Sequence, residues 1–320
     1  MKKYIMGRLL QLIPVLLGIT LLSFALMHSV AGDAIDVMET SRGIVISDEV
    51  KAQMRSDLGL DKPLIVQYGV WLGNILTGNM GISYVSGKSV FDTFMQKLPA
   101  TLILAFISMV LTVIISVPLG IYAAVKQNKF TDYLIRSFSF VGNSLPGFFV
   151  ALLLIYLFSV KLNLFPVIEP SSSLTITSII LPALTLTIAM SAKYIRQLRA
   201  IVLDELAKDY VLAAKARGIK FSVILRKSVL KVCLIPLITL MSLSLGSLLG
   251  GTAIVESIFL WDGVGKMAVD AITMRDYPII LAYVVWMAII YVCVNLLADI
   301  AYHYLDPRIR LGINNGGESK

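Results

Sequence analysis

The residue types that most often carry chemistry are sparse in this 320-residue sequence and poorly spaced for it. Both cysteines, Cys233 and Cys293, lie inside apolar runs, and the two histidines, His28 and His303, have no companion at metal-ligand spacing. We interpret the cysteines as small core residues and the histidines as residues near the ends of apolar segments. The sequence therefore predicts no metal site and no disulfide framework.

One stretch has the outline of a phosphate-binding loop. Gly246 and Gly251 are followed by Thr252, but the required lysine is absent and the stretch lies in an apolar run. Nucleotide binding is rejected there, and Gly246 with Gly250 is interpreted instead as a small-residue face for close helix contact. No other stretch offers such a loop, so the chain is not expected to hydrolyse ATP. An intramembrane enzyme would also need a catalytic constellation, and the sequence contains no HExxH motif.

Two polar residues interrupt the last apolar run. Asn295 and Asp299 are one helical turn apart and share a face. An ionisable group in a membrane segment usually faces the protein interior or a water path, but Asp299 can also reach the interface or Arg308. With these two, the residues proposed to line a translocation pathway are Asn143, Met190, Met241, Asn295 and Asp299.

The elements that must position these residues are membrane helices. The residues are 57% hydrophobic and only 15% charged, whereas soluble domains are about a quarter charged. Apolar runs long enough to cross about 30 Å of hydrocarbon predict an all-α integral membrane protein with six transmembrane helices. The runs lie at 9–30, 99–125, 133–160, 174–196, 229–255 and 278–305.

The net charge of +8 follows this topology. With the N-terminus inside, most of the 28 lysines and arginines fall on the cytoplasmic side. The bias of short loops toward cytoplasmic Lys and Arg then predicts that both termini are cytoplasmic. The basic charge is thereby explained by the membrane topology and by contact with anionic lipid headgroups, and nucleic acid is not an expected partner.

Four parts are predicted along the chain. They are an N-terminal cytoplasmic tip with the first transmembrane helix (1–30), a helical extracytoplasmic insertion (31–98), a transmembrane core of five helices (99–310) and a flexible cytoplasmic tail (311–320). Within the insertion, the apolar stretch 64–76 is expected to lie on the membrane surface, to cap the external mouth, or to form part of a small helical subdomain.

The external segment from Glu256 to Pro278 mixes acids with apolar residues, as a re-entrant or mouth-capping element would. Two alternatives stay open for its acids. They attract a cationic solute to the mouth, or they are ordinary solvated charges.

The longest polar interval in the second half of the chain runs from Asp204 to Pro236. It is predicted to form two short helices broken at Gly218, because glycine readily takes the left-handed conformation that ends a helix. Leu206, Tyr210 and the pair Ala213–Ala214 recur at helical spacing. Alanines let another surface come close, and this face is too weakly apolar for strong lipid burial, so a protein partner is expected.

The element Ala213-Ala214-x-x-x-Gly218, between two late spans, resembles the EAA loop of ABC importer permeases. Leu212 stands where the family usually has Glu, and Pro236 lies farther from the glycine than in sugar importers. Both departures are typical of the peptide and nickel branch. Longer stretches resemble that branch over essentially the whole chain, including RLLQLIPVLLGITLLSF at 8–24, DYVLAAKARG at 209–218 and NLLADIAYHYLDPRIR at 295–310.

The resemblance implies a type I ABC importer permease fold and the first of two permease subunits in a bacterial cell membrane. The partners it implies are a second homologous permease, two cytoplasmic ATPase subunits and an extracytoplasmic solute-binding protein. It also implies that the loop 199–228 carries a coupling helix that docks on an ATPase. The docking residues expected from it are Asp209, Tyr210, Ala213, Ala214, Arg217 and Gly218.

The resemblance implies transport by alternating access, with ATP and Mg²⁺ used by the partner subunits and no cofactor bound by this chain. The solute is expected to be nickel or a nickel chelate, with di- and oligopeptides close behind. The alternative is a self-contained secondary transporter or channel, which would show an inverted repeat and charged relays across several spans.

Overall fold

The computed structural model describes residues 2–28, 35–36, 39, 43, 45–57, 59–166 and 175–305, and the conclusions below concern these residues. Regular structure in them is helical, with one isolated antiparallel bridge between Ile82 and Ser89. This confirms the predicted all-α class. The chain divides into two compact units, 1–101 with 261–292 and 102–260 with 293–320, and each is considered by itself.

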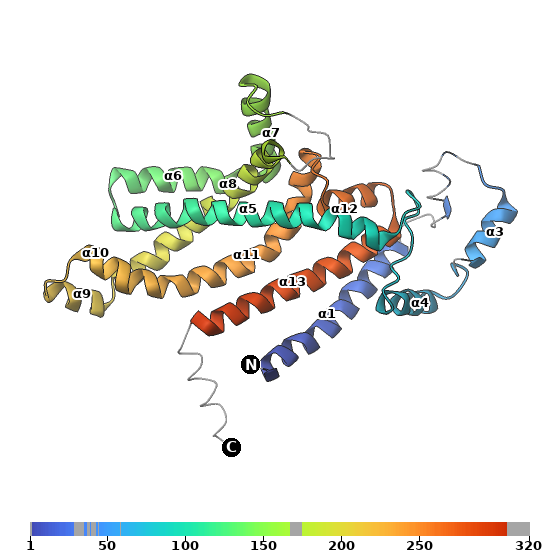
Figure 1. The fold of residues 1–320 in the computed structure, drawn as a ribbon, viewed down its shortest axis with the longest axis horizontal. Coiled ribbons are helices and arrows are strands. Elements are labelled where there is room, and N and C mark those ends of the chain that lie inside the picture. Colours follow the sequence, from blue (N-terminus) through green and yellow to red (C-terminus); the bar gives the residue numbers. More distant parts are fainter. Residues whose placement is uncertain are drawn as a thin grey trace, which may run out of the picture. The chain divides into compact units, whose positions relative to one another are not determined.

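The first unit contains the N-terminal helices and the helices near the end of the chain. They are α1 (Lys2–His28), α3 (Asp48–Asp57), α4 (Leu64–Leu76), the beginning of α5 (Val90–Val125), α12 (Val264–Thr273) and the beginning of α13 (Tyr277–Leu305) (Figure 1). Asp48 and Glu49 start α3 at the positive end of its dipole, as the sequence predicts.

The core of the first unit joins α5, α12 and α13. Val90 and Phe94 of α5 pack with Val264 and Met267 of α12. The Trp286 ring stacks on Phe94 with 5.6 Å between ring centroids.

Buried polar groups of this unit are paired. The Trp261 indole N–H donates to the Ala100 carbonyl over 3.1 Å, and the Val264 N–H donates to Thr101 Oγ1 over 2.9 Å. These contacts fix the chain that enters α12 against the first part of α5.

Two acids of the segment 256–278 are buried, whereas Asp262 and Asp270 are about half exposed. Asp276 is 2% exposed and accepts hydrogen bonds from the Ser83 hydroxyl and the Tyr84 N–H. Asp262 is paired with Lys97, and Glu256 is fully buried. Both sequence-based alternatives are therefore wrong for Asp276 and Glu256, because each side chain lies in the protein interior.

The second unit is built around α8 (Ile176–Leu206). Its other elements are the end of α5, α6 (Phe130–Ser144), α7 (Gly147–Leu154), η1 (Ile155–Lys161), α9 (Asp209–Ala216), α10 (Phe221–Ile224), η2 (Leu225–Val229), α11 (Leu230–Ile258) and the end of α13. In Figure 1, α6 folds back along α5. Glycines allow close contacts with α8: a Cβ added at Gly120 would lie 3.1 Å from Leu198 Cβ, and one at Gly142 would lie 3.1 Å from Ala192 Cβ.

A buried ion pair joins α6 to α8. Arg199 donates from Nε to Asp132 Oδ1 over 2.7 Å and from a terminal nitrogen to Oδ2 over 2.8 Å. Asp132 Oδ2 also accepts the N–H of Asn128, which has a left-handed φ of 62° in the turn before α6. The carboxylate, itself fully buried, thus holds both the α5–α6 turn and α8.

The predicted span 133–160 is bent sharply. Helix α6 ends at Ser144, Pro146 precedes α7, and the two helices turn through 104° (Figure 1). Proline cannot supply the N–H that would continue α6. By contrast, α8 continues through Pro182 and α11 through Pro236.

Length and composition identify three helices that can cross a membrane within the described residues, or four if the bent pair forms one span. The three are Val90–Val125, Ile176–Leu206 and Tyr277–Leu297. The count of six spans and the four-part division of the chain stay predictions, and residues 306–320, including the predicted tail, lie outside the described residues.

Candidate functional site

The loop between α8 and α11 is the candidate site, and it begins later than the sequence indicates. Helix α8 runs on to Leu206, so Asp204 is helical rather than part of the loop. Ala207 and Lys208 reverse the chain, and α9 follows at Asp209–Ala216. Two helices separated at Gly218 are found as predicted.

One side of α9 is packed into the second unit. Val211 is fully buried, and Ala214 is half-buried against the same cluster. This cluster, which we call the loop core, draws on five further elements besides α9. Its buried members are Ala124, Tyr194, Leu198, Val202, Val211, Ile224, Val229, Cys233 and Leu237. Side-chain packing therefore links α9 to α8 and α11.

A polar contact closes the reversal between α8 and α9. Glu205, 7% exposed, accepts a hydrogen bond from the Tyr210 hydroxyl over 3.0 Å and pairs with Lys208 Nζ at 2.6 Å. Desolvation is the main effect that raises the pKa of Tyr210 to about 12, and the hydrogen bond to Glu205 adds to it. The phenol therefore stays a neutral donor at physiological pH. Tyr210, predicted to dock, thus has a structural contact inside the loop.

The C-terminus of α9 has the geometry of a Schellman motif. The Gly218 N–H donates to the Lys215 carbonyl over 2.9 Å, and the Ile219 N–H donates to the Ala214 carbonyl over 3.2 Å. Gly218 has a φ of 77°, and a Cβ placed there would meet no atom within 4 Å. The backbone conformation, rather than crowding, accounts for glycine at this position.

The outer side of the loop is exposed and has no partner segment packed on it among the described residues. Of the six predicted docking residues, Asp209, Tyr210, Ala213, Arg217 and Gly218 are exposed, and Ala214 turns partly inward. Leu212 is 57% exposed beside Ala213. Exposed basic residues surround this surface: Lys208, Lys215, Arg217, Lys220, Arg226 and Lys227.

Sequence reasoning placed the apolar face of α9 incorrectly. It grouped Ala213 with Ala214, whereas the structure puts Val211 and Ala214 inside and Ala213 outside. The missed signal was Val211, a β-branched residue three positions before Ala214. Leu212 was read only as a departure from the family pattern, and Glu205 was not singled out at all.

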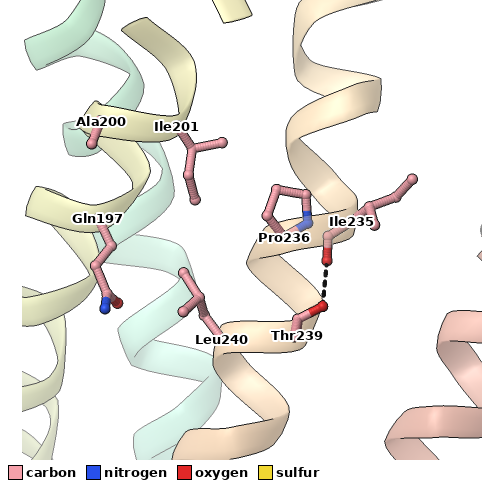
Figure 2. Close-up of a pocket in the computed structure, with 7 residues that line it drawn as sticks. All are labelled: Gln197, Ala200, Ile201, Ile235, Pro236, Thr239 and Leu240. Carbon is pink, nitrogen blue, oxygen red and sulfur yellow. Dashed lines mark hydrogen bonds between the residues drawn. The ribbon is translucent and has the colours of Figure 1, made fainter. Parts of the chain in front are cut away.

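A cavity of about 500 Å³ lies between α8 and α11 (Figure 2). Gln197, Ala200 and Ile201 line it from α8, and Ile235, Pro236, Thr239 and Leu240 line it from α11. The Thr239 hydroxyl donates a hydrogen bond to the Ile235 carbonyl over 3.1 Å. Gln197 Oε1 is buried and accepts no hydrogen bond from the described part of the chain. The wall of the cavity is thus mostly apolar, since Gln197 Oε1 has almost no accessible surface.

The predicted pathway residues lie on α6, α8, α11 and α13, and their role in a pathway stays a prediction. Met190 of α8 and Met241 of α11 both pack, half-buried, against the loop core. Asn143 is exposed at the last turn of α6, and Asn295 is half-buried on α13. The side chain of Asp299 lies outside the described residues.

Two family models match the chain. One is described as "Binding-protein-dependent transport system inner membrane component" and matches residues 116–311. The other is described as "Binding-prot-dependent transport system membrane comp, N-term" and matches residues 1–105. Together they match nearly the whole chain, including the loop between α8 and α11.

Curated relatives match over nearly their full length. An oligopeptide transport system permease protein, AppB of Bacillus subtilis (strain 168), is 40% identical over 97% of this chain and 99% of its own. A glutathione transport system permease protein, GsiC of Escherichia coli (strain K12), is 36% identical over the same shares. A dipeptide transport system permease protein, DppB of Escherichia coli (strain K12), is 34% identical, again over 97% and 99%.

Solved structures share the fold at low sequence identity. A chain of the MetNI methionine ABC transporter in an inward-facing conformation aligns with a TM-score of 0.55 and 16% identity. The alignment covers 67% of this chain and 96% of that one. At this identity the likeness concerns the fold alone.

Proposed function

Because the chain belongs to the family of binding-protein-dependent transport system inner membrane components, it is a permease subunit of an ABC importer, and we propose that α9 is its coupling helix. Membership implies ATPase and solute-binding partners in general. The further components of this proposal are a second homologous permease, two ATPase subunits, and a bacterial inner membrane with both termini on the cytoplasmic side.

One observation carries the assignment of α9: its two sides differ. Val211 is fully buried in the loop core, while Leu212 and Ala213 next to it are exposed. A single exposed leucine is ordinary on a protein surface, but here Leu212 lies beside the exposed Ala213 in the loop that resembles the coupling loop of the family. A protein groove accommodates such a narrow surface, and the surrounding lysines and arginines favour an acidic rim on the partner.

In this proposal the ATPases, using ATP and Mg²⁺, move α9, and α8 and α11 follow through the loop core. The cavity between α8 and α11 then changes size between inward-open and outward-open states. Its mostly apolar wall suits a solute with apolar parts. This chain is proposed to bind no cofactor of its own.

Short peptides are the proposed solute. Three relatives named as oligopeptide, glutathione and dipeptide permeases support a peptide-type cargo. Nickel or a nickel chelate, favoured slightly by the sequence alone, remains the competing cargo for the same assay.

The test is uptake and ATPase activity of the reconstituted complex with Ala213→Glu. Ala213 is exposed, so the added carboxylate should leave the subunit folded but block close contact with the ATPase. Solute uptake is expected to fall at least tenfold, with loss of ATPase co-purification or with ATP hydrolysis no longer stimulated by the binding protein. Ala213→Ser, which adds only one hydroxyl, is the matched control and should stay near wild type.

Wild-type uptake with Ala213→Glu, at an unchanged melting temperature, would remove α9 from the coupling role. The transported solute is identified by uptake assays with the same vesicles. Uptake of labelled di- and tripeptides is compared with uptake of nickel, with and without a chelator.

A further inference from the structure

Helix α4 is apolar on the side that the protein leaves uncovered. Its thirteen residues, Leu64–Leu76, include no charged side chain, and none of them is buried. Ile65 and Leu76 are each 80% exposed, and Val70 is 54% exposed. In water these side chains would form an unpartnered hydrophobic patch.

The other side of α4 is attached to α1. The hydroxyls of Tyr68 and Thr20 are 2.9 Å apart in a hydrogen bond. The ring of Phe24 meets Tyr68 edge-on at 5.5 Å between centroids, and Tyr68 stacks on Trp71 at 5.9 Å. These contacts orient the helix, because Ile65, Val70 and Leu76 then point away from α1 or along its flank.

The attachment point lies within the apolar part of α1. The stretch Ile13–Leu26 is an apolar helix, and Thr20 lies in its middle. With a rise of 1.5 Å per residue, Thr20 is about 12 Å from the end of α1 at His28. A helix bonded there lies beside the apolar stretch of α1 rather than beyond its end.

We propose that α4 is embedded in the outer leaflet of the membrane and that its uncovered side contacts lipid acyl chains. This rests on the proposed function, since it needs α1 to span the membrane. Polar residues at both ends of α4 fit this placement. Asp61 and Lys62 precede it, and Asn74, Thr77 and Asn79 lie at its other end, where headgroups can receive them.

Lipid accounts for the surface better than a protein partner does. A solute-binding protein must dock and leave in every cycle, so it would return an apolar, charge-free surface to water each time. A bilayer covers such a surface permanently. The exposed side chains of α1 in the same stretch, such as Leu21 and Leu22, are equally apolar, so the two surfaces form the same kind of lipid contact.

Site-directed spin labelling of the full complex in lipid nanodiscs tests the placement. Single cysteines at Ile65→Cys, Val70→Cys and Leu76→Cys are introduced after Cys233→Ala and Cys293→Ser. Collision rates with oxygen, which concentrates in lipid, are compared with those of a water-soluble nickel chelate. Leu22→Cys on α1 is the lipid control and Ala52→Cys on α3 is the water control, since both positions are exposed.

All three α4 labels are expected to resemble the Leu22 label, with an oxygen-to-nickel collision ratio several-fold above that of the Ala52 label. Ratios like that of the Ala52 label, or low collision with both reagents because a protein covers the helix, would overturn the proposal. The proposed function fails in other ways. If the Leu22 label is itself in water, the topology is wrong. If the unlabelled cysteine-free complex takes up no peptide, the transport assignment is wrong rather than the place of α4.

Discussion

The chain reversal before α13 and the loop after α8 both connect helices, but they leave different surfaces. Before α13, Asp276 is buried and accepts hydrogen bonds from Ser83 and Tyr84, so the polar groups are satisfied internally. After α8, only Val211 is fully buried in α9, and Leu212 beside it faces outward.

The difference shows which surface is complete without a partner. A segment whose polar atoms are paired and whose apolar atoms are buried has reached its final environment. On the anchoring side of the loop the side chains are packed, whereas on its outer side apolar side chains stay exposed. This is the pattern expected of an interface. Variants that affect one side alone should therefore separate stability from coupling.

The largest expected effect concerns the anchor of the second unit. Asp132→Ala leaves the partly buried Arg199 without its carboxylate, which should lower the free energy of unfolding by about 3–5 kcal/mol. Detergent-denaturation curves of the purified subunit measure this loss. Arg199→Lys keeps the charge but not the paired geometry and should lose less; equal stability of all three proteins would show that the pair is not an anchor.

Asp276→Ala makes the corresponding change in the first unit. It strands the Ser83 hydroxyl and the Tyr84 N–H, at an expected cost of about 1–3 kcal/mol for the pair. The same denaturation curves measure it, and the loop variants serve as reference. Because the loop lies outside this unit, ATP hydrolysis per folded complex should be unchanged; a specific loss of coupling would contradict the separation of roles.

Val211→Ala and Leu212→Ala compare the two sides of α9 at adjacent positions. Val211→Ala removes two buried methyl groups and should cost about 2 kcal/mol of subunit stability. Leu212→Ala, at an exposed position, should change stability by less than about 0.5 kcal/mol yet weaken ATPase binding. Melting temperature and ATPase co-purification are measured on both, and the reverse pattern would invert the assignment of the two sides.

Among the variants that lose an internal contact, Tyr210→Phe should have the smallest effect on stability, about 1 kcal/mol, because it removes one hydrogen bond to Glu205 at a partly exposed site. The pKa of Tyr210 is raised to about 12, so this contribution is fully present below pH 10 and lost as pH rises through 12. The stability difference between wild type and variant, followed by melting temperature, should thus be constant from pH 7 to 9. A difference that disappears in that range would point to another titrating group.

The sequence predicted features that depend on local chemistry. Gly218 ends α9 because one residue with free access to positive φ is needed there. Apolar runs indicated where the long helices lie. Family membership followed from motifs spread over the whole chain.

Features that depend on distant residues could not be predicted. Nothing in the sequence around Asp132 names Arg199 as its partner, because the two are brought together only by the packing of α6 on α8. The buried state of Asp276 likewise depends on Ser83, far away along the chain. The sequence does not show which side of α9 faces inward. In a helix of only eight residues, the alanines and Val211 both fit a helical spacing, so the pattern favours neither side.

The tight glycine contacts of α8 have a mechanical consequence. With Gly120 and Gly142 bringing α5 and α6 against its backbone, α8 has no room to slide past either neighbour. The 31 residues of α8 span about 46 Å, and the close glycine contacts hold it between Ile188 and Leu198. We expect a displacement of the end that carries α9 to tilt α8 about these contacts, so that each residue moves farther the farther it lies from them.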